Sequence, residues 1–213
     1  MDTEQKRAAM VRDQLQQRGI SDARVLAAME RVPRHRFLPP EAQGNAYADR
    51  AVPIAEGQSI SQPFIVALMA QALQLRGDER VLEIGTGSGY AAAVLSQLAA
   101  DVVTIERLPV LAEAAEQRLA TLGYVNVRVI GGDGTAGLPG EAPFDAITVA
   151  AASPWVPRPL REQLARGGRL VIPVGGRGEQ LLLRVTRDAS GEHVEQRSGV
   201  RFVPLIGAHA WEQ

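Results

Sequence analysis

The 213-residue sequence contains no cysteine, which excludes disulfide bridges, thiolate nucleophiles and thiolate metal sites. Its three histidines, His35, His193 and His209, lie far apart without the spacing of metal ligands, so we predict no metal site. Lys and Arg number 23 against 24 Asp and Glu, and only 4% of the residues are aromatic. A balanced charge with few aromatic residues argues against binding of nucleic acid.

Long apolar runs are also missing. No stretch reaches the roughly 18 apolar residues that span a bilayer, and the opening MDTEQKRAAMVRDQLQQ is polar and helical in pattern, unlike a signal peptide. We therefore expect a cytoplasmic protein without membrane contact. A chain with 46% hydrophobic and 22% charged residues is ordinary for a globular protein, and its length suits a single domain spanning residues 1–213.

From residue 80 onward, apolar strands alternate with amphipathic helices. This alternation is typical of a parallel sheet covered on both faces, so we predict a doubly wound α/β fold with a mostly parallel, seven-stranded sheet. Two tail segments, 179–188 and 193–205, are joined by a short turn and should form an antiparallel pair at the edge of the sheet. The five preceding strand patterns span residues 80–85, 101–106, 126–132, 144–150 and 168–175.

Residues 1–63 precede this alternation and look different. Helical patterns at 4–18 and 21–32 lead into a stretch that carries five prolines and no sustained period up to residue 63. A long irregular segment inside a compact domain is usually either disordered or functional. Its apolar and aromatic residues, among them Phe37 and Tyr47, favour a packed segment, so we predict an N-terminal helical and irregular extension of the domain.

The strand at 80–85 runs into a glycine-rich loop, EIGTGSGY. Gly85, Gly87 and Gly89 alternate with Thr86 and Ser88, which lets the backbone turn sharply and lets a ligand lie against bare main chain at the carboxyl edge of the sheet. The spacing G-x-G-x-G is not the G-x-G-x-x-G of dinucleotide sites, which disfavours a nicotinamide dehydrogenase. A tight turn without a ligand is the structural alternative.

Acidic residues accompany this loop. Glu106 ends the second strand 21 residues after Gly85, where a carboxylate can accept hydrogen bonds from both hydroxyls of a ribose. Asp133 follows the third strand and could accept from an adenine amino group, while Glu83 lies just before the glycines. Three acids suit a ligand with positive charge and no phosphate, such as S-adenosylmethionine. Strand ends or helix caps are the alternative roles.

The segments LEIGTGSGY, GDG, GQSISQP, AMERVPRHRFLP and VRFVPL together resemble the protein-L-isoaspartate O-methyltransferase family, in the family's order and over essentially the whole chain. The resemblance implies a Rossmann-like methyltransferase that uses S-adenosylmethionine and releases S-adenosylhomocysteine. It implies methylation of the free α-carboxyl of L-isoaspartyl residues in damaged peptides and proteins, which initiates repair through a succinimide. Residues 1–63 would then lie on the substrate side, and we expect a monomer.

The resemblance also assigns roles to residues. Ser59, Ile60 and Ser61 would lie over the methyl donor, with Ser61 as the catalytic residue and both serines in contact with substrate. The three acids, the glycine loop and Gly134 would surround the cofactor. Val203, Pro204 and Leu205 would hold the peptide, for which VRFVPL is expected to supply an edge strand.

Some alternatives remain open at this stage. Ser61 is also well placed to cap the helix that begins near Gln62. The chain could methylate another class of substrate, such as a small metabolite or an RNA base, or could be a non-catalytic relative that binds cofactor or peptide. Ser59 stands where the family more often has threonine, and Ala55 where it often has glycine, which bears on substrate preference.

Overall fold

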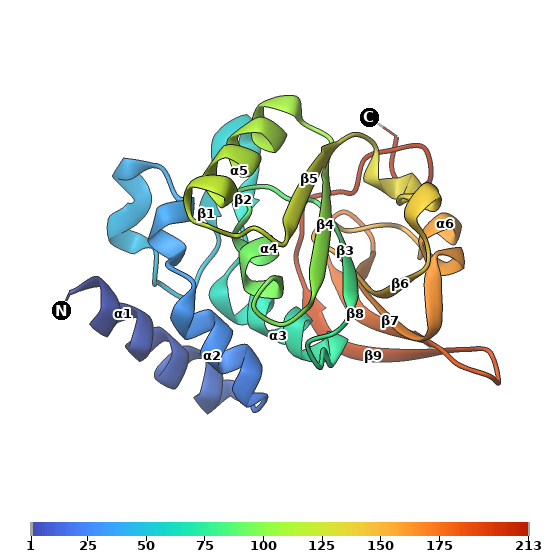
Figure 1. Ribbon diagram of the computed structural model, residues 1–213, viewed down its shortest axis with the longest axis horizontal. Helices are drawn as coiled ribbons and strands as arrows, with labels where there is room; N and C mark the ends of the chain where they lie inside the picture. The colour runs from blue at the N-terminus through green and yellow to red at the C-terminus, as the bar shows by residue number, and fades with distance from the viewer. Residues whose placement is uncertain (1, 213) are drawn as a thin grey trace.

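A seven-stranded sheet runs through the computed structural model, which describes residues 2–212 (Figure 1). The strand order is β5-β4-β3-β6-β7-β8-β9, with parallel pairing from β5 to β7 and antiparallel pairing of β8 and β9. The predicted sheet and its antiparallel edge pair are therefore confirmed. The strands are β3 (Arg80–Ile84), β4 (Asp101–Glu106), β5 (Val127–Gly131), β6 (Phe144–Val149), β7 (Leu164–Gly175), β8 (Gln180–Arg187) and β9 (Glu192–Val200).

Alternating side chains of the central strands enter two separate hydrophobic clusters. In β3, Val81 packs into the cluster under the N-terminal helices, whereas Leu82 and Ile84 pack into the cluster on the opposite face. The helices α3 (Pro63–Leu73), α4 (Tyr90–Leu95) and α5 (Pro109–Thr121) lie on the first side, and α6 (Arg158–Glu162) lies on the second (Figure 1). Helices thus cover both faces, as the alternation predicts.

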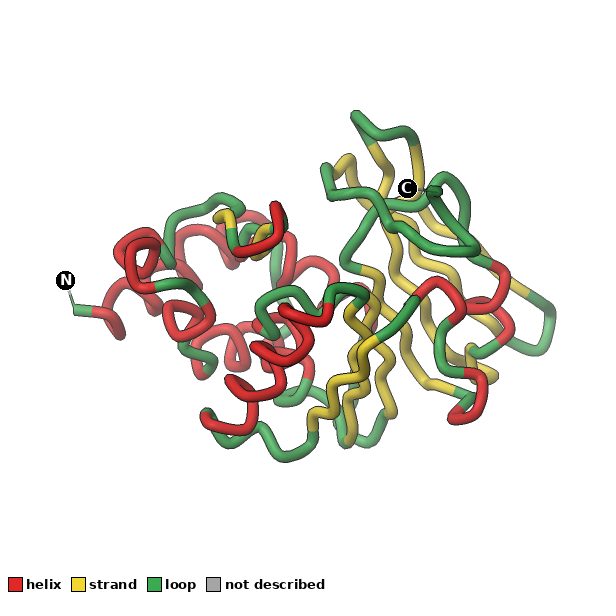
Figure 2. The backbone as a smooth tube through the Cα atoms, turned by 90° about the horizontal axis from the view of Figure 1, so that it is seen from above, coloured by secondary structure: helices red, strands yellow, loops and turns green. Residues whose placement is uncertain are grey.

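The N-terminal extension packs against this first layer of helices. The helices α1 (Thr3–Ala9) and α2 (Ala23–Arg31) are connected by a π-helical turn, Met10–Leu15, and a 3₁₀ turn, Gln16–Arg18. Figure 2 shows the helices of this region gathered on one side of the sheet. Within residues 2–212, no helix has the length and apolar character needed to cross a membrane.

The proline-rich stretch that follows α2 is packed, as its apolar residues predict. Phe37, Val52 and Ile60 are each less than 10% exposed. Two short strands, β1 (Val52–Pro53) and β2 (Ser59–Ile60), pair antiparallel here. Three 3₁₀ turns accompany them, at Arg34–Phe37, Pro40–Asn45 and Ala55–Gly57.

The tail departs from the predicted edge strand. β9 ends at Val200, so the prediction of a strand through residue 205 is wrong for its last part. Residues 201–205 leave the sheet because their main chain bonds elsewhere: Ala152 N–H donates to Val203 O (2.8 Å), and Leu205 N–H donates to Ala152 O (2.7 Å). Pro204 has no N–H to offer a neighbouring strand. The free edge of the sheet is β9 itself.

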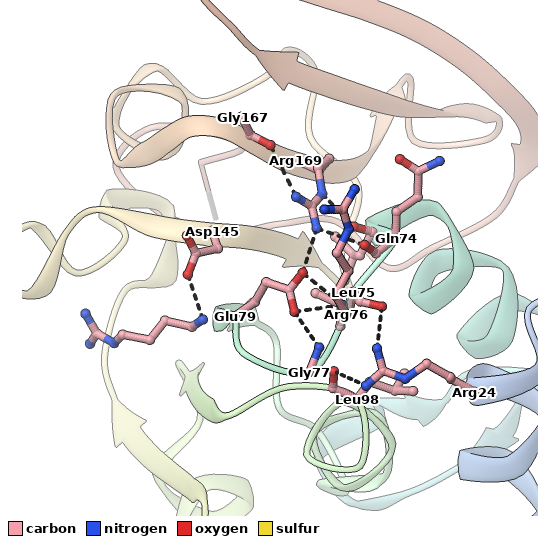
Figure 3. A network of polar contacts seen from close by, with 12 residues as sticks. Arg24, Gln74, Leu75, Arg76, Gly77, Glu79, Leu98, Asp145, Gly167 and Arg169 are labelled. Carbon is pink, nitrogen blue, oxygen red and sulfur yellow. Dashed lines mark hydrogen bonds and ion pairs between the residues drawn. The ribbon is translucent and has the colours of Figure 1, made fainter.

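At the amino end of the sheet, a buried carboxylate fixes the turn between α3 and β3 (Figure 3). Glu79 accepts hydrogen bonds from the backbone N–H groups of Arg76 and Gly77 and an ion pair from Arg169 Nη2 (3.1 Å). Arg169 Nε also donates to Leu73 O (2.7 Å). Burial opposes ionisation of Glu79, but these donors hold its pKa below the ordinary value of 4.5.

Glu79→Ala should lower the unfolding free energy by about 2–3 kcal/mol at neutral pH, because Arg169 loses its partner in a mostly buried setting. Since the pKa of Glu79 is depressed, this contribution is present above pH 4.5 and disappears as the pH falls below that value. Urea unfolding at pH 7 and at acidic pH measures both effects. The control is Glu162→Ala, which breaks the exposed Arg158 pair and should cost under about 0.5 kcal/mol. Equal losses in the two variants would contradict the account.

Candidate functional site

A cavity of about 290 Å³ opens at the carboxyl edge of the parallel strands. It is lined by the segments that leave β3, β4 and β6, by the loop around β2, and by the tail after β9. Most of the residues predicted from sequence meet here: Ser59, Ile60, Ser61, Gly85, Thr86, Gly87, Ser88, Glu106, Gly134, Val203, Pro204 and Leu205. Glu83, Gly89 and Asp133 are not in this lining.

The glycine loop is held in a tight turn. Gly85, Gly87 and Gly89 have φ angles of 92°, 53° and 85°, a region that side chains of other residues rarely adopt. Gly89 N–H donates to Thr86 O (2.9 Å). A Cβ on Gly89 would lie 3.3 Å from the Leu119 side chain, so this glycine permits close packing of α4 on α5 and does not face the cavity.

Glu106 joins the ends of β3 and β4. Its carboxylate accepts from Gly87 N–H (2.9 Å) and Leu108 N–H (3.0 Å) and is only 7% exposed. A carboxylate offers about four lone-pair positions, so acceptor capacity remains for hydroxyl groups of a ligand. The residue therefore both shapes the glycine loop and presents an anion to the cavity.

Glu83 lies beneath the cavity and does not line it. It is fully buried: its Oε2 accepts from Thr104 Oγ1 (2.7 Å), and its Oε1 has no hydrogen-bond partner among the described residues. Burial raises the pKa of Glu83 to about 8, against the hydrogen bond from Thr104 and with a smaller contribution from the charge of Glu106. Glu83 lines a second cavity of about 30 Å³ that also touches Ser61.

Asp133 turns its carboxylate toward the C-terminal tail. Its Oδ1 accepts from Thr135 N–H (2.8 Å) and Oγ1 (2.7 Å), and its Oδ2 accepts from Ala208 N–H (2.8 Å). Burial opposes ionisation, yet these donors lower the pKa of Asp133. The neighbouring Gly134 does line the cavity, and a Cβ there would lie 2.5 Å from the Ile84 side chain.

Ser61 stands at the entrance of α3 without capping it. The N-cap of α3 is Gln62, and no side chain caps the helix. Within the described part of the chain, the Ser61 hydroxyl takes part in no hydrogen bond with another residue, so it remains available to a ligand. Its position is fixed on one side by the buried Ile60 of β2 and on the other by Pro63, the first residue of α3.

A wider groove of about 1140 Å³ meets the first cavity at Ser61. Four residues line both spaces: Ser59, Ser61, Ala150 and Val203. On one side the groove is lined by Arg18 of the N-terminal extension and by Phe64 at the start of α3. On the other side it is lined by the ends of β8 and β9. A small ligand in the cavity and a chain in the groove would therefore share a wall at Ser61.

Sequence reasoning missed several lining residues, notably Tyr90, Leu108 and Ala150. Leu108 and Ala150 follow the ends of β4 and β6, so their place at the carboxyl edge could have been inferred from strand position. Tyr90 connects the cavity to the VPRHRF segment: the guanidinium of the fully buried Arg34 lies 4.8 Å from the centre of its ring, and the Phe37 ring centre lies 5.6 Å from it. No local pattern records that contact.

Comparison with known proteins gives consistent matches. The family model described as Protein-L-isoaspartate(D-aspartate) O-methyltransferase matches residues 5–210. A protein-L-isoaspartate O-methyltransferase of Roseiflexus sp. (strain RS-1) is 60% identical over 99% of this chain and 96% of its own length. A solved structure described as protein-L-isoaspartate O-methyltransferase has a TM-score of 0.84 at 28% identity and covers 97% of this chain and 67% of its own.

A second solved structure includes a ligand. It is described as a putative protein-L-isoaspartate O-methyltransferase from Plasmodium falciparum in complex with S-adenosyl-L-homocysteine. Its TM-score is 0.80 at 26% identity, covering 94% of this chain and 98% of the other. The likeness extends over the N-terminal extension as well as the sheet.

The buried carboxyl of Glu83 should make the unfolding free energy depend on pH. Its pKa is about 8 in the folded protein against an ordinary value of 4.5, so between these values the folded state holds a proton that the unfolded state has released. This contribution to stability is complete below pH 4.5 and decreases as the pH rises to 8.

Glu83→Gln keeps the shape of the neutral side chain, so its stability relative to the native protein should rise by about 3–5 kcal/mol between pH 4.5 and pH 8. Denaturant unfolding of both proteins across this range provides the comparison. A difference that stays constant with pH would show that Glu83 is ionised in the folded state.

Proposed function

The chain belongs to the protein-L-isoaspartate O-methyltransferase family, and from this membership we propose how the cavity of about 290 Å³ and the adjoining groove divide the reaction. Its activity is the S-adenosylmethionine-dependent methylation of L-isoaspartyl residues in peptides and proteins, which begins their repair. In our proposal the cavity of about 290 Å³ holds the methyl donor, and the groove holds the damaged peptide. The meeting of the two spaces at Ser61 is the observation that carries this division.

The residues that line the cavity of about 290 Å³ fit the donor. Glu106 has free acceptor positions at the end of β4, where they suit the two ribose hydroxyls. The main chain of Gly85 and Gly87 allows close approach of the methionine portion, and Gly134 suits the flat face of the adenine. When bound, S-adenosylmethionine supplies a methyl group made electrophilic by a sulfonium.

Methyl transfer to a carboxylate requires that the substrate be correctly positioned, and it requires no general base. An α-carboxyl has a pKa near 3.5, so at neutral pH it is already an anion and can attack without proton removal. The protein has to hold this carboxylate in line behind the methyl group and to exclude part of its water, an effect that can be worth roughly 7–11 kcal/mol. Neither a catalytic histidine nor a cysteine is required.

Ser61 is the group that we assign to this positioning. Ser61 lines both spaces and does not cap α3, so its hydroxyl can donate a hydrogen bond to the substrate carboxylate. A neutral donor orients the anion while lowering its nucleophilicity less than a lysine would. Ser59 lies in the same wall and is a second candidate for contact with the substrate.

The tail and the N-terminal extension form the peptide side of the site. Val203 lines both spaces, and Pro204 and Leu205 continue along the donor cavity, so we assign these three residues to substrate contact. Arg18, Ala51 and Gln62 bring the extension into the groove, which supports a substrate-side role for residues 1–63. A functional monomer stays a prediction from the sequence. Cytoplasmic location stays a prediction from the sequence.

The match over the whole chain disfavours the alternatives that the sequence leaves open. A methyltransferase for an RNA base or small metabolite would not be expected to match the family model from residue 5 to 210. A non-catalytic relative would be expected to have lost the hydroxyl at the junction, yet Ser61 is present there, and its hydroxyl bonds no other residue among 2–212.

The function is tested with two peptides that differ only in aspartate versus isoaspartate. With S-adenosylmethionine labelled at the methyl group, the isoaspartyl peptide should acquire a base-labile ester and the aspartyl peptide should not. The release of label as methanol in mild base distinguishes an ester from methylation of nitrogen. Equal labelling of both peptides, or of neither, would reject the proposed substrate.

Ser61→Ala and Glu106→Ala should separate the two halves of the site. Loss of the Ser61 hydroxyl should lower kcat/KM for the isoaspartyl peptide by about 5- to 150-fold, because one neutral hydrogen bond in the transition state is worth roughly 1–3 kcal/mol. Its affinity for S-adenosylhomocysteine, measured by calorimetry, should stay within about twofold of the native value. Glu106→Ala should weaken that affinity by at least about tenfold.

The assignment fails if Ser61→Ala loses donor affinity as Glu106→Ala does, or if it turns over isoaspartyl peptide at the native rate. Thermal unfolding of each variant separates these outcomes from a loss of fold. A large fall in the melting temperature of Ser61→Ala alone would mean that its main role is structural.

A further inference from the structure

The Asp133 carboxylate links its own turn to the C-terminal tail. Both of its oxygens accept hydrogen bonds, from Thr135 on one side and from Ala208 of the tail on the other. Gly134 lines the cavity, whereas Asp133 does not. These three hydrogen bonds occupy three of the roughly four lone-pair positions of the carboxylate.

Two consecutive backbone N–H groups of the tail dock onto this pair of side chains. Ala208 N–H donates to Asp133 Oδ2 (2.8 Å), and His209 N–H donates to Thr135 Oγ1 (3.1 Å), which itself donates to Asp133. Bonds from N–H to a carboxylate are stronger than those between neutral groups. The tail is thus held here by a carboxylate and its hydroxyl neighbour, and Trp155 Nε1–H also donates to His209 O (3.1 Å).

Gly207 makes this contact possible. A Cβ at this position would lie 2.1 Å from Asp133 Oδ1 and 2.6 Å from Thr135 Cγ2. Because Asp133 is a short side chain fixed by three hydrogen bonds, it could move aside only by breaking some of them. The chain also closes on itself here, with Gly207 N–H donating to Trp211 O (3.0 Å) and Trp211 N–H donating to Leu205 O (3.0 Å).

The docked tail follows directly on residues 201–206, which we call the strap. Phe202 N–H donates to the side chain of Gln180 (2.9 Å) at its beginning, and Ala152 bonds both Val203 and Leu205 in its middle. Val203 lines the donor cavity and the groove, and Ile206 ends the strap in the donor cavity. The strap is therefore a wall shared by the two spaces, with one end in β9 and the other at Asp133.

We propose that Asp133 and Thr135 are positioning residues that latch the strap across the site by binding the Ala208 and His209 N–H groups. Through this contact they act on the methyl donor and on the peptide by way of Val203 and the residues that follow it. The proposal rests on the proposed function for its effect on catalysis, but the latch itself is a property of the tail.

If Asp133, Thr135 and Gly207 form one latch, substitutions at these three chemically different residues should have the same effects on the tail and on binding. Asp133→Asn, Thr135→Val and Gly207→Ala should each speed amide hydrogen exchange in residues 201–209 by about tenfold or more. Each should raise KM for the isoaspartyl peptide and weaken S-adenosylhomocysteine binding together, by about five- to tenfold. Thr135→Ser keeps the hydroxyl and should behave as the native protein. His209→Ala keeps its backbone N–H and serves as the matched control.

The double variant Asp133→Asn with Gly207→Ala gives the sharpest comparison. If both residues act through one latch, the double variant should lose no more than the stronger single variant. Additive losses would overturn the proposal. So would loss of S-adenosylhomocysteine affinity in Asp133→Asn with native exchange rates in the tail and native behaviour of Gly207→Ala, because Asp133 would then be a donor ligand.

Hydrogen exchange and S-adenosylhomocysteine binding need no turnover, so they keep the latch and the proposed function separate. If the native protein fails to methylate isoaspartyl peptide, the proposed function fails, while the exchange rates still decide the latch. Exchange that stays slow in all three single variants would overturn the latch even in an active enzyme.

Discussion

β3 lies between β4 and β6 in parallel register, with Ile84 beside Ile105 on one side and Val149 on the other. The ladder continues one residue beyond β3 and β6, through Gly85 N–H to Ile105 O (2.9 Å) and Ala150 N–H to Ile84 O (2.8 Å). Because parallel strands end at the same edge, this pairing brings the glycine loop, the β4 carboxylate and the β6 exit together. The donor cavity, the groove and their junction all depend on it.

The protein contributes placement, and the donor contributes reactivity. A substrate that is already an anion needs no proton acceptor, so the site can be built from main chain, the Glu106 carboxylate and hydroxyl groups. Burial raises the pKa of Glu83 to about 8, which favours the neutral form of this carboxyl next to Ser61. A second negative charge near Ser61 would repel a carboxylate substrate, so burial of Glu83 suits the reaction.

Much of this arrangement could be predicted because it is local in sequence. The strand 101–106 was predicted to the residue, and the glycine spacing with Glu106 at a strand end located the cavity. The orientation of Glu83 was open to inference, since it alternates with Leu82 and Ile84, which enter the opposite cluster.

The orientation of the Asp133 carboxylate could not be predicted from the local sequence, because its partner Ala208 is 75 residues away. The same holds for the two-residue strands β1 and β2, which are too short to show a period, and for the tail, whose bonds to Ala152 draw it out of the sheet.

A structure of the protein with S-adenosylhomocysteine and an isoaspartyl peptide tests the central claim most directly. The account predicts that the peptide α-carboxylate accepts a hydrogen bond from Ser61 Oγ and lies on the far side of the methyl position from the sulfur, about 3–3.5 Å from where that methyl would be. It would be contradicted by a carboxylate that lies outside reach of Ser61 or that approaches the sulfur from the side.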